Sequence, residues 1–274
     1  MLVDVAARVL FNRRLSPTCN VIGLAAPEVA AGVAPGQFVM VKPSRGIEPL
    51  LRRPFSVFEI LRDDRGTPSG LSLFNKRVGS TTSLLYHADE GDVVSCLGPL
   101  GRPFAPVAPP ARAWMVAGGV GLAPFVTLTA ALRALGTDTT LFYGARTSDE
   151  LFCADLFERA GVRLAVSTED GSRGDRGLVT APLERALDAA PPGERVHLYV
   201  CGPTPMMRAV AALGARCGRE VDVSLEQVMG CGLGGCYSCV IRVRDDEDGG
   251  HYVRSCIGGP VFDARTVVWD ELTH

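Results

Sequence analysis

Four cysteines near the carboxyl end of the chain have a spacing that suits a metal cluster. They are Cys231, Cys236, Cys239 and Cys256, and they form the pattern C-x4-C-x2-C-x16-C. A [2Fe–2S] cluster of the plant type is held by four cysteine thiolates, three from one tight loop and the fourth from elsewhere in the chain. The pattern therefore predicts a [2Fe–2S] site, and such a site transfers electrons.

The loop that carries the first three cysteines is rich in glycine. It reads MGCGLGGCYSC over residues 229–239. Glycine tolerates positive φ angles, so the backbone can turn its amide groups toward the cluster sulfurs. A zinc site is the alternative. Zinc ligands usually come as two separated C-x2-4-C pairs, whereas this chain has one such pair and two outlying cysteines.

The composition describes an ordered chain without a polyionic partner. Its 274 residues are enough for two domains and a small appendage, and 47% of them are hydrophobic. The net charge of −2 gives no electrostatic reason to expect binding to nucleic acid or to an anionic membrane. We therefore expect no nucleic-acid partner.

The other cysteines indicate a reducing compartment. They are scattered and suggest no disulfide framework: Cys19, Cys96, Cys153, Cys201 and Cys217. A thiolate cluster site also favours reducing conditions, and residues 1–10 lack the apolar core of a signal peptide. These features predict a cytoplasmic location.

One apolar segment is long enough to raise the question of a membrane. Residues 113–132 carry no charge, and about twenty apolar residues can span a bilayer. The centre of the segment, GGVGLAP, contains three glycines and a proline and makes a poor continuous helix. A buried strand, a glycine turn and a helix from about Pro124 explain the same pattern, so we expect no membrane segment.

The first region, residues 1–110, has the pattern of an antiparallel β-barrel or sandwich. Short apolar or alternating runs are separated by Gly and Pro. The expected strands include 37–41, 55–60, 71–74 and 93–97. The proline-rich stretch 105–110 is typical of a stiff linker.

The second region, residues 111–221, alternates strand and helix patterns, which predicts a doubly wound parallel sheet. The expected strands are 113–117, 139–143, 163–167 and 196–200, and the expected helices are 124–135, 149–160, 181–189 and 205–217. The third region, residues 222–274, holds the cysteine loop and a strand over 240–243. We therefore expect an α/β multidomain chain divided at about residues 110 and 221.

Two motifs in the second region fall at the ends of expected strands. The first is a glycine turn made by Gly118, Gly119 and Gly121, and the second is the triplet Cys201, Gly202 and Pro203. Open α/β sheets bind ligands beyond the carboxyl ends of their strands, and a pyrophosphate meets the amides that begin a helix. The glycine turn lacks the full G-x-G-x-x-G fingerprint and could be an ordinary tight turn. Together the motifs predict a nicotinamide-nucleotide site.

Two segments of the first region suit a phosphate-bearing ligand. The first comprises Arg53, Pro54, Phe55 and Ser56; the arginine fork matches a phosphate, the ring could cover an aromatic group and the hydroxyl could bond to the ligand. The second, GSTTS at 79–83, offers hydroxyls and amides at the start of a short helix. A surface arginine and an ordinary N-cap are the alternatives. We find no acid–base pair, so we expect no catalytic side chain and place the chemistry in cofactors.

The order of these motifs resembles the ferredoxin–NADP reductase superfamily. It has R-P-x-S at 53–56, GPLG at 98–101, G-G-x-G-x-A-P at 118–124 and C-G-P at 201–203. The tail, MGCGLGGCYSC at 229–239 with CIGGPVF at 256–262, is similar to that of the electron-transfer subunits of type B dihydroorotate dehydrogenases. The resemblance covers nearly the whole chain.

The resemblance implies FAD, a [2Fe–2S] cluster and NAD as the redox groups. It makes the barrel an FAD domain, the α/β region an NAD domain and the tail a cluster module. The residues that it implies for FAD are Arg53, Pro54, Phe55, Ser56, Phe74, Asn75, Lys76, Thr81 and Thr82, and those for the cluster are the four cysteines. Family members usually have Tyr-Arg in place of Asn75-Lys76 and Gly-Thr in place of Thr81-Thr82, so the second FAD segment departs from the family pattern.

The resemblance also implies a partner. An FMN-containing dihydroorotate dehydrogenase catalytic subunit would form a heterotetramer with this chain, two copies of each, and electrons would pass through the cluster and FAD to NAD in pyrimidine biosynthesis. Similar subunits serve ferredoxin:NADP oxidoreductases, sulfhydrogenases and sulfite reductases, and a redox sensor is a further alternative. Arg146, after the second expected strand, could meet the 2′-phosphate of NADP or lie free on the surface, which leaves the choice between NAD and NADP open.

Overall fold

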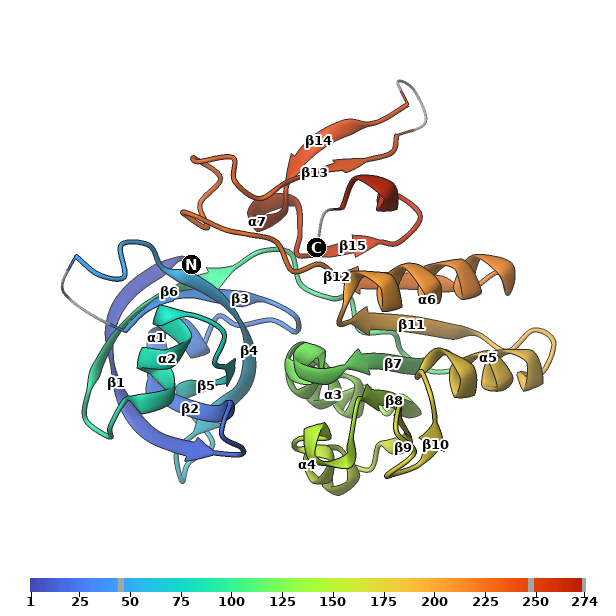
Figure 1. Cartoon of the computed structure of the whole chain (residues 1–274), viewed down its shortest axis with the longest axis horizontal. Coiled ribbons are helices and arrows are strands. Elements are labelled where there is room, and N and C mark those ends of the chain that lie inside the picture. Colours follow the sequence, from blue (N-terminus) through green and yellow to red (C-terminus); the bar gives the residue numbers. More distant parts are fainter. Residues whose placement is uncertain (44–46, 246–248, 273–274) are drawn as a thin grey trace.

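The chain folds into a closed barrel, an α/β unit and a smaller C-terminal layer (Figure 1). The computed structural model describes residues 1–43, 47–245 and 249–272. In Figure 1 the blue-to-cyan barrel stands beside the green-to-orange α/β unit, and the red C-terminal segment lies above both. Within the described residues, no helix is both long enough and apolar enough to cross a membrane.

The barrel confirms the expected antiparallel β architecture. Its strands follow the order β1-β2-β5-β4-β3-β6, and every pairing is antiparallel. The strands are β1 (Val3–Arg14), β2 (Cys19–Ala25), β3 (Phe38–Lys42), β4 (Arg53–Arg62), β5 (Pro68–Lys76) and β6 (Val93–Leu100). Two short helices, α1 (Pro27–Ala30) and α2 (Ser80–His87), accompany them. Aliphatic side chains from all six strands fill the interior, which accounts for the alternating pattern of the sequence.

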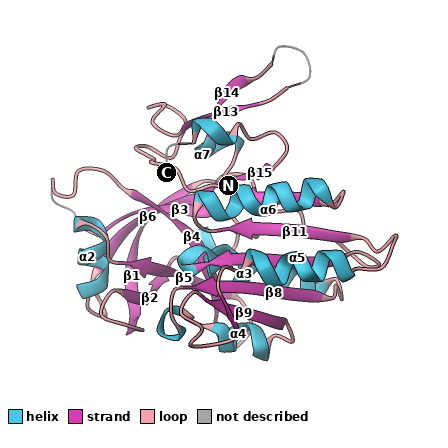
Figure 2. Cartoon of the chain, turned by 45° about the vertical axis from the view of Figure 1, so that its right-hand side comes forward, coloured by secondary structure: helices cyan, strands magenta, loops and turns pink. Residues whose placement is uncertain are grey.

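The α/β unit confirms the doubly wound arrangement. Its sheet has the order β10-β9-β8-β7-β11-β12-β15 and is parallel except for β15. The strands are β7 (Arg112–Gly118), β8 (Thr139–Ala145), β9 (Arg163–Thr168), β10 (Asp175–Arg176), β11 (Val196–Cys201), β12 (Glu220–Ser224) and β15 (Val261–Asp263). The helices are α3 (Ala123–Ala134), α4 (Ala154–Arg159), α5 (Thr180–Ala189) and α6 (Thr204–Arg216). Figure 2 shows α5 and α6 in front of the strands, and separate apolar clusters pack on the two faces of the sheet.

The expected helix over residues 149–160 was wrong in its extent. The structure has a 3-10 turn, η2 (Ser148–Glu150), then a break, and α4 begins only at Ala154. Cys153 lies in the break with a left-handed φ of 56°. The break lets the Phe152 ring lie 5.8 Å from that of Phe74 in the barrel. A contact between the two large units has therefore overridden the local helical pattern.

The C-terminal segment leaves the sheet and returns to it. After β12 it forms the cysteine loop, then the hairpin β13 (Val240–Val243) and β14 (His251–Arg254), and then α7 (Ser255–Gly258). It re-enters the sheet as β15, antiparallel to β12, and a 3-10 turn, η3 (Trp269–Glu271), follows. The segment that contains the cysteine loop is thus anchored to the sheet at both ends, by β12 and β15.

Aromatic side chains fix the segment that joins the barrel to the sheet. Phe104 is 1% exposed, and its ring meets Tyr199 edge-on at 5.4 Å and stacks on Phe125 at 6.0 Å. The hydroxyl of Tyr199 donates to the carbonyl of Ala105 at 2.8 Å and accepts from the amide of Val107 at 3.0 Å. Offset and edge-on aromatic pairs stabilise beyond the area that they bury, so the linker is held rigidly.

Replacing Phe104 by alanine should lower the free energy of unfolding by about 3–5 kcal/mol, because the truncation leaves a cavity between the barrel and the sheet. Urea denaturation of the cofactor-loaded protein measures the change. Leu84→Ala, at a side chain that is 46% exposed, is the control and should cost less than about 1 kcal/mol. Equal losses in the two variants would contradict this role of Phe104.

Candidate redox site

The cysteine loop lies against the outer face of the barrel. Met229 and Cys239, at its two ends, are buried in one cluster with Met40 of β3 and Leu100 of β6. A Cβ on Gly232 would come within 2.5 Å of the Met40 side chain, and the φ of Gly232 is 72°. Both the space and the backbone therefore require glycine at this position, which holds the loop close to the barrel.

The four predicted ligands come together as two pairs. Cys231 is close enough to Cys236 to influence the pKa of its thiol, and Cys239 is close enough to Cys256 to do the same. The amide of Ser255 donates to the carbonyl of Cys239 at 2.9 Å. This bond joins the segment that carries the fourth cysteine to the end of the loop that carries the other three.

The local environment sets different protonation states for two of these thiols. Hydrogen bonds from Ser238, then from Cys231, lower the pKa of Cys236 to about 6. Burial, followed by the hydrogen bond with Cys239, raises the pKa of Cys256 to about 12. Metal ligation requires thiolates. Cys236 therefore offers a thiolate at neutral pH, whereas Cys256 must release a proton as it ligates.

The pairs fit a two-iron cluster better than one zinc ion. Among the described residues, no three Cys, His, Asp or Glu side chains converge closely enough to hold one metal ion. Structural zinc needs four ligands around one centre, whereas a [2Fe–2S] cluster distributes four thiolates over two irons. The hydroxyl of Ser255 is buried beside Cys256 without a hydrogen-bond partner, so it is also able to donate to a cluster sulfur.

The glycine turn and the Cys-Gly-Pro triplet are in backbone contact. A Cβ on Gly121 would come 2.3 Å from the carbonyl oxygen of Cys201, and a Cβ on Gly202 would come 2.9 Å from the amide nitrogen of Gly118. The turn, η1 (Gly119–Leu122), follows β7, and the triplet follows the adjacent strand β11. The structure thus brings these motifs together at the carboxyl edge of the sheet, where open α/β sheets bind ligands.

The remaining residues at this edge leave room for a ligand. Gly119 has a φ of 54°, and no heavy atom lies within 4 Å of where its Cβ would be. Pro203 packs over Gly118, as does Met206, whose role the sequence motifs did not indicate. Burial raises the pKa of the Cys201 thiol to about 12. Cys201 is therefore a neutral thiol at physiological pH and not a nucleophile.

The first predicted FAD segment lies at the start of β4, beside the α/β unit. Ser56 shares a strand face with Phe58, which packs into the apolar cluster of α3 and the sheet. Phe55 is half-buried against the barrel interior, and Pro54 pairs with β3. Arg53 is exposed, and its Nη1 donates to the carbonyls of Leu51 and Arg52. Its guanidinium therefore keeps donors for a phosphate.

The predicted FAD residues at the end of β5 are more deeply enclosed. Phe74 is buried and packs on Phe152 of the α/β unit. Asn75 is fully buried, and its amide donates to the carbonyl of Thr82 at 2.9 Å. Lys76, at the end of β5, is exposed. In this segment only the lysine side chain lies open to solvent.

The start of α2 contains buried polar atoms that a bound nucleotide could satisfy. The hydroxyl of Thr82 accepts from the amides of Val78 and Gly79 at 2.9 Å each, so it is committed to the loop. The hydroxyl of Thr81 and the side-chain oxygen of Asn75 are buried without partners. Buried polar atoms are normally paired, so these two fit a site for a ligand rich in hydroxyl and phosphate groups, such as FAD.

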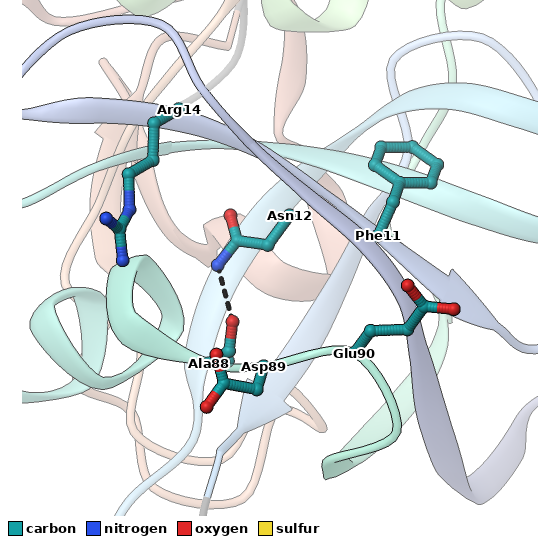
Figure 3. Close-up of a pocket in the computed structure, with 6 residues that line it drawn as sticks. All are labelled: Phe11, Asn12, Arg14, Ala88, Asp89 and Glu90. Carbon is teal, nitrogen blue, oxygen red and sulfur yellow. Dashed lines mark hydrogen bonds between the residues drawn. The ribbon is translucent and has the colours of Figure 1, made fainter.

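A surface hollow of about 500 Å³ lies between the end of β1 and the segment that follows α2 (Figure 3). It is lined by Phe11, Asn12, Arg14, Ala88, Asp89 and Glu90. The Asn12 amide is already used, because it donates to the carbonyl of Ala88 at 2.8 Å and to two carbonyls at the end of α2. This asparagine therefore caps the carboxyl end of α2. None of the predicted site residues lines the hollow.

Comparisons with known proteins agree with this geometry. Residues 115–212 match the oxidoreductase NAD-binding domain, and residues 226–268 match the iron–sulfur cluster binding domain of dihydroorotate dehydrogenase B. The electron transfer subunit of dihydroorotate dehydrogenase B (NAD(+)) from Desulforamulus reducens is 35% identical over 96% of this chain and 98% of its own length. This chain belongs to the family of dihydroorotate dehydrogenase B electron transfer subunits. The subunit from Bacillus caldolyticus is 39% identical over 85% of this chain and 86% of its own.

The fold of this dihydroorotate dehydrogenase B family member is similar to that of solved ferredoxin–NADP oxidoreductases. A structure of an NADH-dependent reduced ferredoxin–NADP oxidoreductase superposes with a TM-score of 0.84 at 29% identity, over 98% of this chain and 91% of that one. A ferredoxin NADP+ reductase from Neisseria gonorrhoeae with bound FAD and NADP has a TM-score of 0.61 at 18% identity, over 79% of this chain and 92% of that one. The family match confirms the iron–sulfur module and the NAD-binding fold that the sequence predicted.

Replacing Gly121 by alanine should weaken NADH binding by about tenfold or more, because the new Cβ pushes the two backbone motifs apart and overpacking typically costs about 1–3 kcal/mol. NADH titration followed by flavin absorbance measures the effect. Gly32→Ala is the control, because its Cβ would meet nothing closer than 3.4 Å. Unchanged NADH affinity in Gly121→Ala would place the nucleotide elsewhere.

Proposed function

We propose that this chain is the electron-transfer subunit of an NAD-dependent dihydroorotate dehydrogenase. In this reaction dihydroorotate and NAD+ give orotate, NADH and a proton, and two electrons cross this chain. The observation that carries the proposal is that one chain combines two cysteine pairs with a close backbone contact between Gly121 and Cys201, at the sheet edge where nucleotides bind. Membership of the family supports the choice of substrate.

Each part of the chain has a separate task in this proposal. The cysteine pairs hold the [2Fe–2S] cluster; Arg53, Pro54, Phe55, Ser56, Phe74, Asn75, Lys76, Thr81 and Thr82 surround FAD; and the glycine turn with the Cys201-Gly202-Pro203 triplet holds NAD. A flavin exchanges electron pairs with nicotinamide and single electrons with a cluster, so FAD supplies the conversion between them. In this proposal residues 1–110, 111–221 and 222–274 are the three functional units, and the last returns to the sheet of the second through β15.

The chain itself supplies position and shielding and not an acid or a base. Ser56 faces the α/β unit from the barrel, and the Gly118–Gly202 contact faces the ligand-binding edge of the sheet. A flavin bound along β4 would therefore meet a nicotinamide bound at the sheet edge. The neutral Cys201 thiol excludes water beside that edge without adding charge.

The electron-transfer subunit needs a catalytic partner, and the cluster module offers a surface for it. Apolar side chains on or near the cysteine loop are unusually exposed: Val228, Leu233, Tyr237, Tyr252 and Ile257. Exposed apolar groups of this kind mark interaction surfaces, and Cys236 lies exposed among them. We propose that an FMN-containing catalytic subunit docks here, in a heterotetramer with two copies of each chain. Nine free thiols support a cytoplasmic location.

A second candidate keeps the same cofactors but changes the partner. The likeness to an NADH-dependent reduced ferredoxin–NADP oxidoreductase covers 98% of this chain at 29% identity. The dihydroorotate dehydrogenase relatives are 35–39% identical, and the cluster-binding domain that residues 226–268 match is that of dihydroorotate dehydrogenase B. The choice between the two therefore depends on which partner this chain serves.

The test is dihydroorotate-dependent reduction of NAD by this chain co-purified with the dihydroorotate dehydrogenase catalytic subunit of the same genome. Cys236→Ser should abolish this coupled activity, because it removes a cluster ligand, while NADH-dependent flavin reduction is retained. Cys217→Ser, at the end of α6, is the matched control and should keep both activities.

Two outcomes would contradict the proposal. Full coupled turnover by Cys236→Ser would show that electrons bypass the cluster. No turnover by the wild-type complex, with FAD and the cluster both present, would assign this chain to another partner.

The geometry near β8 predicts a preference for NADH over NADPH. The Nε of Arg146 lies 3.1 Å from an Oε of Glu150, and a second, shorter bond completes a bidentate ion pair. The ion pair offsets the positive charge of the arginine, and the carboxylate would repel a 2′-phosphate. Glu150→Gln should raise kcat/KM for NADPH relative to NADH at least about tenfold, equivalent to about 1.4 kcal/mol. Asp149→Asn is the neighbouring control. If the ratio of kcat/KM for NADPH to that for NADH is unchanged in Glu150→Gln, this ion pair does not determine the cofactor preference.

A further inference from the structure

Arg254 connects the two segments that supply the cluster ligands. It ends β14, two residues before Cys256, yet its Nη1 donates to the carbonyl of Gly234 at 2.9 Å in the middle of the cysteine loop. Its guanidinium carbon also lies 5.0 Å from the centre of the Tyr237 ring. One side chain therefore holds both sides of the cluster site.

The loop is shaped to receive this side chain. Gly234 has a φ of 77°, and a Cβ there would meet Ile257 at 2.9 Å and the Nη1 of Arg254 at 3.5 Å. Tyr237 also has a left-handed φ, 59°, which is uncommon for a residue other than glycine. The guanidinium thus fills the space between the loop and the helix that carries Cys256.

Arg254 differs from the other arginine of this hairpin in its charge balance. Arg242, on β13, is paired with Glu271 at 2.7 Å. In the described part of the chain, Arg254 forms no ion pair with a carboxylate and bonds to a carbonyl and a ring instead. Its positive charge is therefore not offset by an adjacent acid, and the residue is half-buried two positions before the predicted ligand Cys256.

We propose that Arg254 is a positioning residue that fixes the cysteine loop to the Cys256 segment and raises the reduction potential of the cluster. A reduced cluster carries one more negative charge than an oxidised one, so a fixed cation nearby favours the reduced form. Net charge and hydrogen bonding around a cluster are known to set its potential, and residues behind the ligands tune metal sites. The inference rests on the proposed cluster but on neither dihydroorotate nor NAD.

The test is the midpoint potential of the purified FAD- and cluster-loaded protein, followed by the electron paramagnetic resonance signal of the reduced cluster. Arg254→Gln should lower the potential, because the cation is removed while a donor is kept. Arg254→Lys should keep a potential close to that of the wild type and release iron faster to a chelator, since lysine keeps the charge but not the fork. Arg242→Gln is the matched control and should leave the potential unchanged.

Two results would overturn the proposal: a wild-type potential in Arg254→Gln, or an equal fall in Arg242→Gln. If Arg254→Gln loses its iron on purification, Arg254→Lys carries the test: its potential must stay close to that of the wild type while it releases iron faster. Iron release from Arg254→Lys at the wild-type rate would also overturn the proposal. Because the readout needs no partner or substrate, its failure is distinct from failure of the dihydroorotate assay.

Discussion

The close packing of the cysteine loop on the barrel is the contact on which the proposed electron path depends. Gly232 lets the loop approach Met40 on the outer face of β3, while β12 and β15 hold the two ends of the segment that contains the loop to the sheet. The loop is thus tied to the two units that are proposed to bind FAD and NAD. Electron transfer needs carriers at fixed, short separations, and this three-way attachment supplies them without a long mobile connection.

The contacts between the barrel and the sheet also keep the proposed cofactor sites at a fixed separation. Phe104 and Tyr199 clamp the linker, and Phe74 packs on Phe152 across a second contact. Both contacts are aromatic and buried, so the strand that carries Ser56 keeps its place beside the sheet. The glycines at 118, 121 and 202 then allow two backbone turns to approach more closely than any side chain permits. Rigidity and close approach are therefore provided by different residue types.

Much of the fold was predictable because its local patterns agree with its tertiary packing. The strands and helices of the α/β unit lie near the expected ranges, since each buries one clear apolar face. The first two barrel strands were not identified; β1 alternates exposed polar residues with few buried ones, which weakens its apolar signal. The break at Cys153 and the hydrogen bond from Arg254 to Gly234 depend on contacts between distant segments. No local pattern could reveal them, whereas the cysteine spacing identified its site directly.

The return of the chain as β15 has a consequence for how such proteins are assembled from smaller parts. Because β15 covers the edge of β12, the iron–sulfur module is an insertion between two strands of one sheet and not a tail that can be shed. A shortened gene product ending after β12 would expose a row of unpaired backbone groups, which invites edge-to-edge aggregation. Loss of the module during evolution would therefore require a new cover for that edge, and a two-domain reductase cannot be made from this chain by truncation alone.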